Sequence, residues 1–245
     1  MKKVFSKSPM LAETQFHYCP GCGHGIVHRL ISESIEELGL HDRVIGIAPV
    51  GCSVFAYDYF NFDMMQAAHG RAPAVATGIK RALPESIIFA YQGDGDIASI
   101  GLAEVMHAAA RGENFTIVFI NNAIYGMTGG QMAPTTLLGQ RTTTSAEGRT
   151  ETQGYPIKLC EILATMEAPA FIARTSIHDA ANVLKTKTAI KKGFQNQADG
   201  KGFSLIEVLS NCPVNLNMTP VQSMDFVKNA MIKTFPLGVF RDKGE

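Results

Sequence analysis

The sequence has neither a long apolar run nor an excess of charge of one sign. No stretch approaches 18 consecutive apolar residues, so no transmembrane helix is predicted. Lys plus Arg and Asp plus Glu both number 22, so the charge balance indicates binding neither to nucleic acid nor to a membrane surface. The basic start is not followed by an apolar stretch of about 7–15 residues, so we expect no signal peptide and a cytoplasmic location.

Disulfides are a second expected absence. The chain has five cysteines, an odd number, and thiols stay reduced in the cytoplasm. Metal or cluster ligation is therefore the leading interpretation, at least for the close pair Cys19 and Cys22. Tandem repeats and low-complexity segments are also lacking. The 245 residues, 46% of them apolar, are enough for one large domain with a sizeable core.

Apolar runs alternate with helical patterns along the chain. The runs at residues 86–91 and 115–120 are continuous, which is typical of central parallel strands covered on both faces. The alternation predicts an α/β fold with a doubly wound, mostly parallel sheet and helices on both faces. Further strands are expected at 44–48, 169–175 and 203–209, and helices at 26–38, 69–82, 99–109, 156–166 and 179–193.

The ends of the chain and one long loop fall outside this pattern. We expect a single domain over residues 1–245, with a Cys-rich arm at 1–25 and a C-terminal segment at 211–245 that wraps the surface. The Gly- and Thr-rich loop at 121–154 is long enough to indicate a functional or disordered segment. Its later part either orders on binding a ligand or is a solvated surface loop.

The most informative motif joins two predicted strand ends. Gly93-Asp94-Gly95 follows one buried strand, and Asn121-Asn122 follows the next. Ligands of such sheets bind outside the carboxyl ends of the strands, so Asp94 and Asn122 should converge if their strands are neighbours. A carboxylate, an amide oxygen and the carbonyl of Ile124 suit Mg²⁺.

Glycines and a following helix suit a diphosphate at the same place. Glycines let the backbone approach closely, and the next helix, with Ser99 as its expected N-cap, offers amides to an anion. A tight turn between strand and helix is the plainer interpretation of Gly-Asp-Gly alone. The paired asparagines at this spacing favour the cofactor site.

The motif as a whole is similar to the thiamine-diphosphate motif. The string GDGDIASIGLAEVMHAAARGENFTIVFINNAIYGMTGGQ resembles the β subunits of 2-oxoacid:ferredoxin oxidoreductases, and the resemblance covers about residues 16–240. It implies the diphosphate-binding domain of the thiamine-diphosphate-binding fold, with Asp94, Asn122 and Ile124 as Mg²⁺ ligands. The positions that it places at the cofactor are Gly51, Cys52, Ser53, His69, Gly93, Gly95, Asp96, Gly126, Met127 and Thr128, with His69 and Met127 nearest the substrate.

Four cysteines end different predicted elements. Cys19-Pro-Gly-Cys22 is a C-x-x-C turn, Cys52 follows the first strand, and Cys212 follows the last. Spacing alone leaves a [4Fe–4S] cluster, a zinc site and a redox pair open. The family resemblance implies that Cys19, Cys22, Cys52 and Cys212 bind a [4Fe–4S] cluster. Cys160 lies on an apolar helix face and is expected to be a small core residue.

The resemblance also implies an activity and partners. The reaction would convert a 2-oxoacid to acyl-CoA and CO2, with coenzyme A accepting the acyl group and ferredoxin the electrons. The glutamate that contacts the pyrimidine ring of the cofactor belongs to a partner chain in this family, so we expect activity only with an α subunit, with γ and δ subunits as further candidates. Two alternatives stay open, a cluster-free thiamine-diphosphate decarboxylase or ligase and a non-catalytic zinc-binding assembly subunit.

The substrate is the least determined feature. Met127 is apolar and adaptable, which favours a branched aliphatic 2-oxoacid such as 2-oxoisovalerate. Arg71, Arg141 or a partner residue could instead bind the second carboxylate of 2-oxoglutarate. The group Lys185, Lys187, Lys191 and Lys192 is most simply the solvated face of a helix, with a ferredoxin-docking surface as the alternative.

Overall fold

One seven-stranded sheet organises the chain. The computed structural model describes residues 6–244, and its strands follow the order β2-β1-β3-β4-β6-β5-β7. All pairings are parallel except that of β7 with β5. The strands are β1 (Val44–Ala48), β2 (Asp63–Gln66), β3 (Ile87–Gly93), β4 (Thr116–Asn121), β5 (Phe171–Ser176), β6 (Ser204–Leu209) and β7 (Gly238–Asp242).

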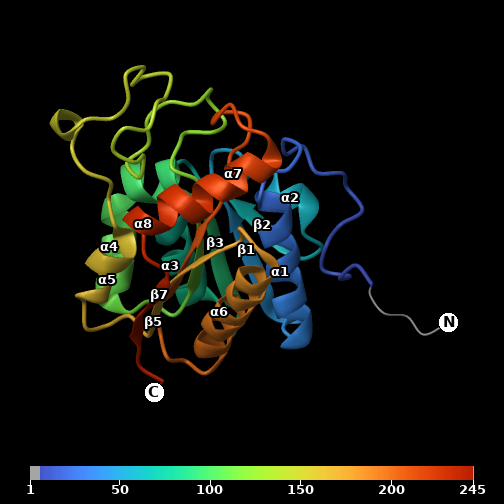
Figure 1. Cartoon of the computed structure of the whole chain (residues 1–245). Coiled ribbons are helices and arrows are strands. Elements are labelled where there is room, and N and C mark those ends of the chain that lie inside the picture. Colours follow the sequence, from blue (N-terminus) through green and yellow to red (C-terminus); the bar gives the residue numbers. More distant parts are fainter. Residues whose placement is uncertain (1–5, 245) are drawn as a thin grey trace.

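Helices cover both faces of this sheet, as Figure 1 shows. The α-helices are α1 (His24–Glu37), α2 (Ala56–Tyr59), α3 (Ala72–Ala82), α4 (Leu102–Arg111), α5 (Leu159–Ala164), α6 (Ala180–Ala198), α7 (Pro220–Phe226) and α8 (Ile232–Thr234). Two 3₁₀-helical turns are η1 (His41–Arg43) and η3 (Glu151–Gln153), and two π-helical turns are η2 (Asp96–Ile100) and η4 (Val227–Met231).

Two cores lie on opposite faces of the sheet. Helices α1 and α6 pack on one face, where Ile31 and Phe194 join the strand residue Phe89. Helices α3, α4 and α5 pack on the other, around residues such as Val105 and Phe115. Each such side chain, fully buried, stabilises the fold by about 1.5–3 kcal/mol. The predicted doubly wound α/β fold is therefore confirmed.

The continuous apolar runs mark the strands well, and the short or exposed elements were missed. The five predicted strands match β1, β3, β4, β5 and β6. Strand β2 lacks an apolar run because most of its residues are exposed. Ser99 as an N-cap was wrong: Gly95 precedes η2, Ser99 lies inside that turn, and Gly101 precedes α4.

The terminal segments differ from their expected description. Residues 1–5 of the expected arm lie outside the described residues, and α1 already begins at His24. The C-terminal segment does more than wrap the surface, because β7 joins the edge of the sheet. The helical part of the C-terminal segment also contributes to a third core, in which Val227, Met231 and Phe235 pack with Ala123, which follows β4, and Leu209 of β6. In residues 6–244, no helix has the length and apolar character needed to cross a bilayer.

Candidate functional site

A cavity of about 400 Å³ lies at the carboxyl ends of β3 and β4. The two strands are parallel neighbours with Gly93 in register with Ile120, so the residues that follow them emerge together. The predicted convergence of Asp94 and Asn122 is thereby confirmed. The lining residues are Val50, Gly51, His69, Gly93, Asp94, Gly95, Asp96, Asn122, Ile124, Tyr125, Gly126, Met127, Thr128 and Gln131.

Asp94 is a buried carboxylate held by neutral donors. Its Oδ1 accepts a hydrogen bond from the amide of Gly95 at 2.8 Å, and its Oδ2 accepts one from the hydroxyl of Thr135 at 2.6 Å. Burial raises the pKa of Asp94 to about 6, against the lowering effect of these hydrogen bonds. Among the described residues it forms no ion pair with a basic side chain, so a cation bound in the cavity would supply the missing countercharge.

The turn after β4 presents Asn122 and Ile124 to the cavity. Ala123, between them, has a φ of +60°, which residues with a Cβ seldom adopt. Both of its peptide groups are held: its amide donates to Oδ1 of Asn121 at 3.1 Å, and its carbonyl accepts from Thr136 at 2.7 Å and from Gln140 at 2.9 Å. Oδ1 of Asn122 accepts a weaker bond from the amide of Ile124 at 3.3 Å.

Glycines leave room along the cavity wall. A Cβ added at Gly51 or Gly93 would meet no atom within 4 Å, so both positions face open space. A Cβ at Gly95 would come within 2.0 Å of the ring of Tyr125, which packs directly on that peptide. The backbone of Gly93 thus faces open space, and the backbone of Gly95 is packed against the ring of Tyr125. An open and fixed backbone of this kind suits a diphosphate.

His69 and Asp96 form the opposite side of the cavity. Oδ1 of Asp96 accepts from the amide of Gly70 at 2.8 Å, and its Oδ2 accepts from Gln92 at 2.5 Å. Nδ1 of His69 lies 2.6 Å from Oδ1 of Asp96, outside hydrogen-bond geometry. Asp96 therefore fixes the loop that carries His69, and the ring stays partly exposed to the cavity.

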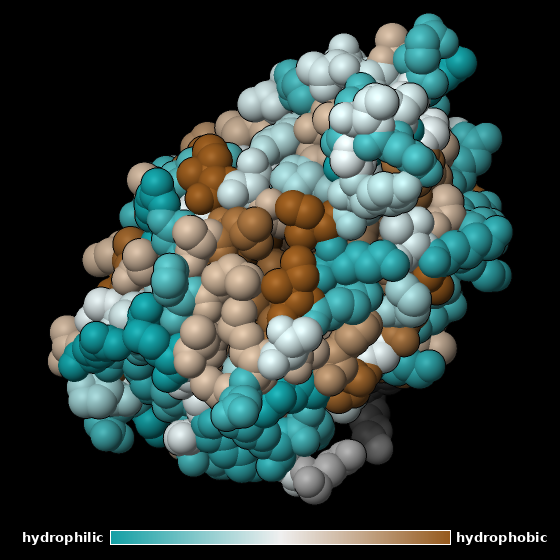
Figure 2. Space-filling view, turned by 90° about the vertical axis from the view of Figure 1, so that its left-hand side faces the viewer, coloured by the Kyte–Doolittle hydropathy of each residue, from teal (hydrophilic) through white to brown (hydrophobic). Residues whose placement is uncertain are grey.

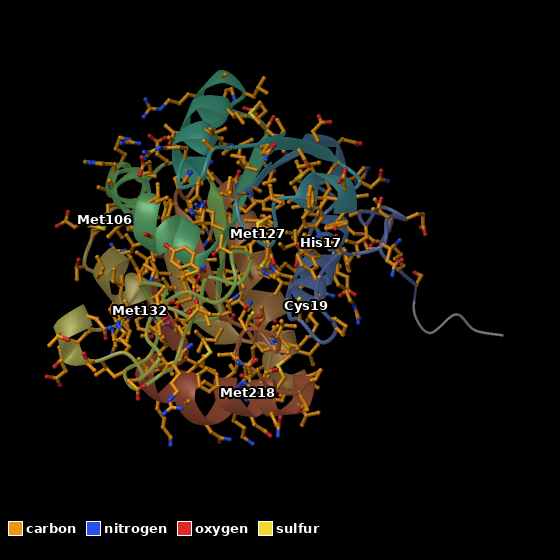
Figure 3. All side chains as sticks on the ribbon, turned by 90° about the horizontal axis from the view of Figure 1, so that it is seen from above. His17, Cys19, Met106, Met127, Met132 and Met218 are labelled. Carbon is orange, nitrogen blue, oxygen red and sulfur yellow. The ribbon has the colours of Figure 1, made fainter. Side chains whose placement is uncertain are left out.

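Two exposed apolar side chains lie at the cavity or near it. Met127, which lines the cavity, is 54% exposed, and Ile100, which lies beside Gly70 next to the lining residue His69, is 50% exposed. Seen from above, Met127 lies near the centre of the molecule, with Met106 to one side and His17 and Cys19 to the other (Figure 3). The side of the molecule with α4 and α5 shows apolar side chains gathered around a hollow with hydrophilic margins (Figure 2).

The cysteine group adjoins the cavity at Gly126. A Cβ added there would lie 3.0 Å from Sγ of Cys52 and 3.6 Å from Sγ of Cys212, so both thiols rest against this peptide. Asn215 links the same parts, donating to the carbonyl of Gly126 at 2.8 Å and to Sγ of Cys212 at 3.3 Å. One backbone segment thus separates the cavity from the thiols.

The four predicted cysteines influence one another. Burial first, then the neighbouring thiols, raise the pKa of Cys22 to about 11 and that of Cys52 to about 12. Burial also raises the pKa of Cys212, with Cys19 and Asp94 acting in the same direction. In residues 6–244 no three His, Cys, Asp or Glu side chains are close enough to hold a single metal ion. The four thiols are therefore near enough to act on one another's pKa values.

Some candidate residues do not lie at the cavity. Cys52 and Ser53 do not line it, although Gly51 does. Cys160 is fully buried, as expected of a core residue, and donates to Glu207 at 3.1 Å. Arg71 pairs with Glu104, and Arg141 is exposed away from the cavity lining. The lysines of α6 are largely paired: Lys187 and Lys191 bond Glu37, and Lys192 bonds Asp242.

Sequence reasoning missed the residues that support the site from a distance. Thr135 reaches Asp94 from a loop 41 positions later, and Asn215 reaches Gly126 from beyond β6. Gln131 lines the cavity and bonds the hydroxyl of Thr128 at 2.5 Å. No local pattern marks these contacts, since a Thr or Asn in a loop is ordinarily a turn former.

Comparison with known proteins identifies the fold at this site. The family described as "Thiamine pyrophosphate enzyme, C-terminal TPP binding domain" matches residues 49–208, which include the whole cavity lining. The chain belongs to this family. It therefore contains a thiamine-diphosphate-binding domain, as the Gly-Asp-Gly and Asn-Asn pattern predicts.

Relatives narrow the membership further. The chain is 37% identical over 221 residues to the 2-oxoglutarate synthase subunit KorB of Methanocaldococcus jannaschii, covering 88% of this chain and 78% of that protein. It is 50% identical over 244 residues to the ketoisovalerate oxidoreductase subunit VorA of Methanothermobacter marburgensis. That match covers 99% of this chain and 51% of the relative, so the chain spans about half the length of its VorA relatives. Its family is that of the β subunits of 2-oxoacid:ferredoxin oxidoreductases.

A solved structure has the same fold. The 2-oxoglutarate:ferredoxin oxidoreductase from Magnetococcus marinus, with 2-oxoglutarate, coenzyme A and succinyl-CoA bound, aligns with a TM-score of 0.80 and 24% identity. The alignment covers 99% of this chain and 87% of that chain. At this identity the likeness supports the arrangement of strands and helices.

Proposed function

We propose that the chain is the thiamine-diphosphate-binding β subunit of a 2-oxoacid:ferredoxin oxidoreductase that acylates coenzyme A. The enzyme would convert a 2-oxoacid to acyl-CoA and CO2 and pass the electrons through a [4Fe–4S] cluster to ferredoxin. The observation that carries this proposal is the contact of Gly126 with both the cavity and the thiols of Cys52 and Cys212. This contact supports the proposal because the cofactor in the cavity and a cluster on these thiols would be separated by one peptide.

The cavity residues fit magnesium and a diphosphate. Asp94, Asn122 and the carbonyl of Ile124 supply the hard oxygen ligands that Mg²⁺ prefers. The open glycines at 51 and 93 leave space for the diphosphate, and the first amides of η2 would be offered to it. Bound thiamine diphosphate supplies the carbanion chemistry. In this proposal the chain anchors and orients it, with His69 and Met127 nearest the reacting carbon.

The thiols fit a cluster better than a single zinc ion. Cys19, Cys22, Cys52 and Cys212 gather from separate elements, yet no three of them are close enough for one ion in the described part of the chain. A cube of four irons and four sulfides spreads its cysteine ligands over a larger cage. Because their pKa values are raised, ionising these thiols costs free energy, and bound iron would offset this cost by stabilising the thiolates.

The cavity favours an apolar substrate side chain. Met127 is half-exposed at the mouth, Tyr125 and Ile124 line the wall, and Arg71 is paired with Glu104. A branched aliphatic 2-oxoacid such as 2-oxoisovalerate suits this lining better than 2-oxoglutarate, whose second carboxylate would need a free cation. The 50% identity to a ketoisovalerate oxidoreductase subunit supports the same choice.

An α subunit would complete the site in the cytoplasm. Met127 in the cavity lining and Ile100 beside Gly70 expose apolar surface. A partner that carries the pyrimidine-binding domain and its glutamate would cover this apolar surface, and γ and δ subunits and ferredoxin are further partners in the proposal. The expected single domain over residues 1–245 is part of the same proposal.

Anaerobic co-purification with the α subunit tests the proposal. The chain should be brown and contain iron, and it should absorb broadly at about 400 nm because of Fe–S charge transfer. Only the complex should reduce a dye with 2-oxoacid, coenzyme A and thiamine diphosphate. Full activity of the chain alone would contradict the partner requirement. A colourless protein holding zinc would favour an assembly subunit, and a colourless protein that still binds the cofactor would favour a simple decarboxylase.

A further inference from the structure

A buried carboxylate lies behind the cavity, on the next strand. Glu207, on β6, is 1% exposed and does not line the cavity. Its Oε1 accepts a hydrogen bond from Nδ2 of Asn121 at 2.7 Å. Its Oε2 accepts from Nε of Arg174 at 2.7 Å and from the thiol of Cys160 at 3.1 Å. Three donors thus converge on one carboxylate, which must remain an acceptor to satisfy them.

The charge of Glu207 fixes which way the Asn121 amide faces. The nitrogen and oxygen of a side-chain amide lie in one plane and point to different sides of the Cβ–Cγ bond, so a nitrogen bound to Glu207 directs the oxygen the other way. That oxygen accepts the amide N–H of Ala123 at 3.1 Å. The first asparagine of the pair therefore links the buried carboxylate to the turn that follows β4.

This turn needs to be held because its backbone is strained. Ala123 has a φ of +60°, and such a conformation persists only where neighbours enforce it. Thr136 and Gln140 hold its carbonyl, and Asn121 accepts from its amide, which also acts on the carboxylate of Asp94. The two residues on either side, Asn122 and Ile124, carry the oxygens proposed for Mg²⁺.

We propose that Glu207 is a positioning residue for the magnesium site and acts through Asn121. The inference rests on the proposed function, since it takes Asp94, Asn122 and Ile124 as the ligands. Outer hydrogen-bond partners of metal ligands commonly change metal affinity by about 10- to 100-fold when they are altered. Glu207 is one hydrogen bond further from the metal than such partners, so its effect on metal affinity should fall at the lower end of this range.

Glu207→Gln is the informative substitution because it keeps the shape and removes one acceptor. The new amide nitrogen would face either Arg174 or the Asn121 nitrogen, and both are donors. If the Asn121 amide rotates to relieve this clash, its nitrogen faces the N–H of Ala123 and the hold on the turn is lost. Glu161→Gln is the matched control, because Glu161 bonds the same Arg174 at 2.9 and 2.6 Å but has no contact with Asn121.

The experiment measures Mn²⁺ affinity by electron paramagnetic resonance on the full chain with thiamine diphosphate, alongside thermal unfolding. Both variants should lower Tm, because both weaken the Arg174 network. Only Glu207→Gln should weaken Mn²⁺ binding, by about tenfold. Asn121→Ala should weaken it to a similar extent with the Glu207–Arg174 pair intact, and adding Glu207→Gln to it should cause little further loss.

Two outcomes overturn the inference and are distinguishable. If Asp94→Ala abolishes Mn²⁺ binding while Glu207→Gln binds as tightly as Glu161→Gln, Glu207 has no positioning role. The same holds if Asn121→Ala binds Mn²⁺ normally, which decides the question even where Glu207→Gln fails to fold. If Asp94→Ala binds Mn²⁺ like the natural chain, the proposed magnesium site is itself wrong and the inference falls with it.

Discussion

At the scale of single residues, the buried charge of Asp94 lowers the free energy of unfolding, and the proposed magnesium site requires that charge. It is buried, its pKa is raised, and its partners are neutral donors. Asp94→Asn keeps an acceptor oxygen for the amide of Gly95 and presents an amide nitrogen to Thr135, whose hydroxyl can accept as well as donate, and it removes the buried charge. We expect the cofactor-free variant to unfold about 2–4 °C higher, which corresponds to a gain on the order of 1 kcal/mol.

The same variant should lose its response to the cofactor. Mg²⁺ with thiamine diphosphate should raise Tm of the natural chain and leave that of Asp94→Asn unchanged, because ligand stabilisation requires binding. Differential scanning calorimetry with and without the cofactor measures both effects. A variant that is still stabilised by Mg²⁺ would show that Asp94 is not a ligand.

Gly126 is the residue where the two centres meet. A Cβ at this position would lie 3.0 Å from Sγ of Cys52, closer than an ordinary contact, so a thiol must shift. Gly126→Ala should therefore lower the iron content and the absorption at about 400 nm. Gly78→Ala, in α3 with no atom within 4 Å of the added Cβ, is the control and should keep its iron. Equal iron in both variants would remove the basis for placing the cluster beside Gly126.

At the scale of elements, Arg149 organises the long loop after β4. Its buried guanidinium donates to the carbonyls of Ala133, Pro134, Thr136, Gln153, Gly154 and Tyr155. The same loop supplies Thr135 to Asp94 and Thr136 to Ala123. Arg149 thus ties the two ends of this loop together close to the residues that bond Asp94 and Ala123.

Arg149→Met should release this anchoring. Several buried carbonyls would lose their donor, so we expect a loss of about 2–4 kcal/mol in the free energy of unfolding. Hydrogen exchange should accelerate in residues 133–155 before the rest of the chain. Arg141→Met, at an exposed arginine of the same loop, should change neither quantity. An unchanged exchange rate in Arg149→Met would contradict the anchoring role.

The sequence predicts elements according to how continuous their apolar surface is. Strands β3 and β4 are buried along nearly their whole length, so their runs are unmistakable. Strand β7 pairs only with β5 at the edge and is half-exposed, so its five residues show neither a run nor a clear alternation. Ser99 is not a cap because it lies inside the π-helical turn η2, which begins after Gly95 and ends at Gly101, where α4 begins.

The same reasoning explains which parts of the site were foreseen. Asp94 and Asn122 each follow a strand directly, so the topology of the sheet alone brings them together. Thr135, Asn215 and Glu207 act through contacts between distant segments, and nothing in their local sequence specifies the partner. Ligand positions at strand ends are therefore predictable, whereas the hydrogen bonds that orient them require the fold.

At the scale of the whole molecule, the exposed apolar surface of Ile100 and Met127 should be a subunit interface. Ile100→Lys places a charge on this surface and replaces none of the proposed magnesium ligands, so it should prevent assembly with the α subunit and leave Mn²⁺ binding unchanged. Leu184→Lys, at a 66% exposed position on α6, is the control and should assemble normally. Size-exclusion chromatography of the co-expressed chains measures assembly. Normal assembly of Ile100→Lys would place the interface elsewhere.

The peptide at Gly126 also limits how this protein can be redesigned. Because one backbone segment forms both a wall of the cavity and a support for two thiols, the cavity cannot be reshaped there without moving the cysteine group. If the proposed cluster is present, widening the pocket through the neighbouring positions 127 and 128 should shift the reduction potential of that cluster with each change in substrate preference. Selection for a new substrate would act on electron transfer at the same time, so the two properties of such an enzyme would evolve as one trait.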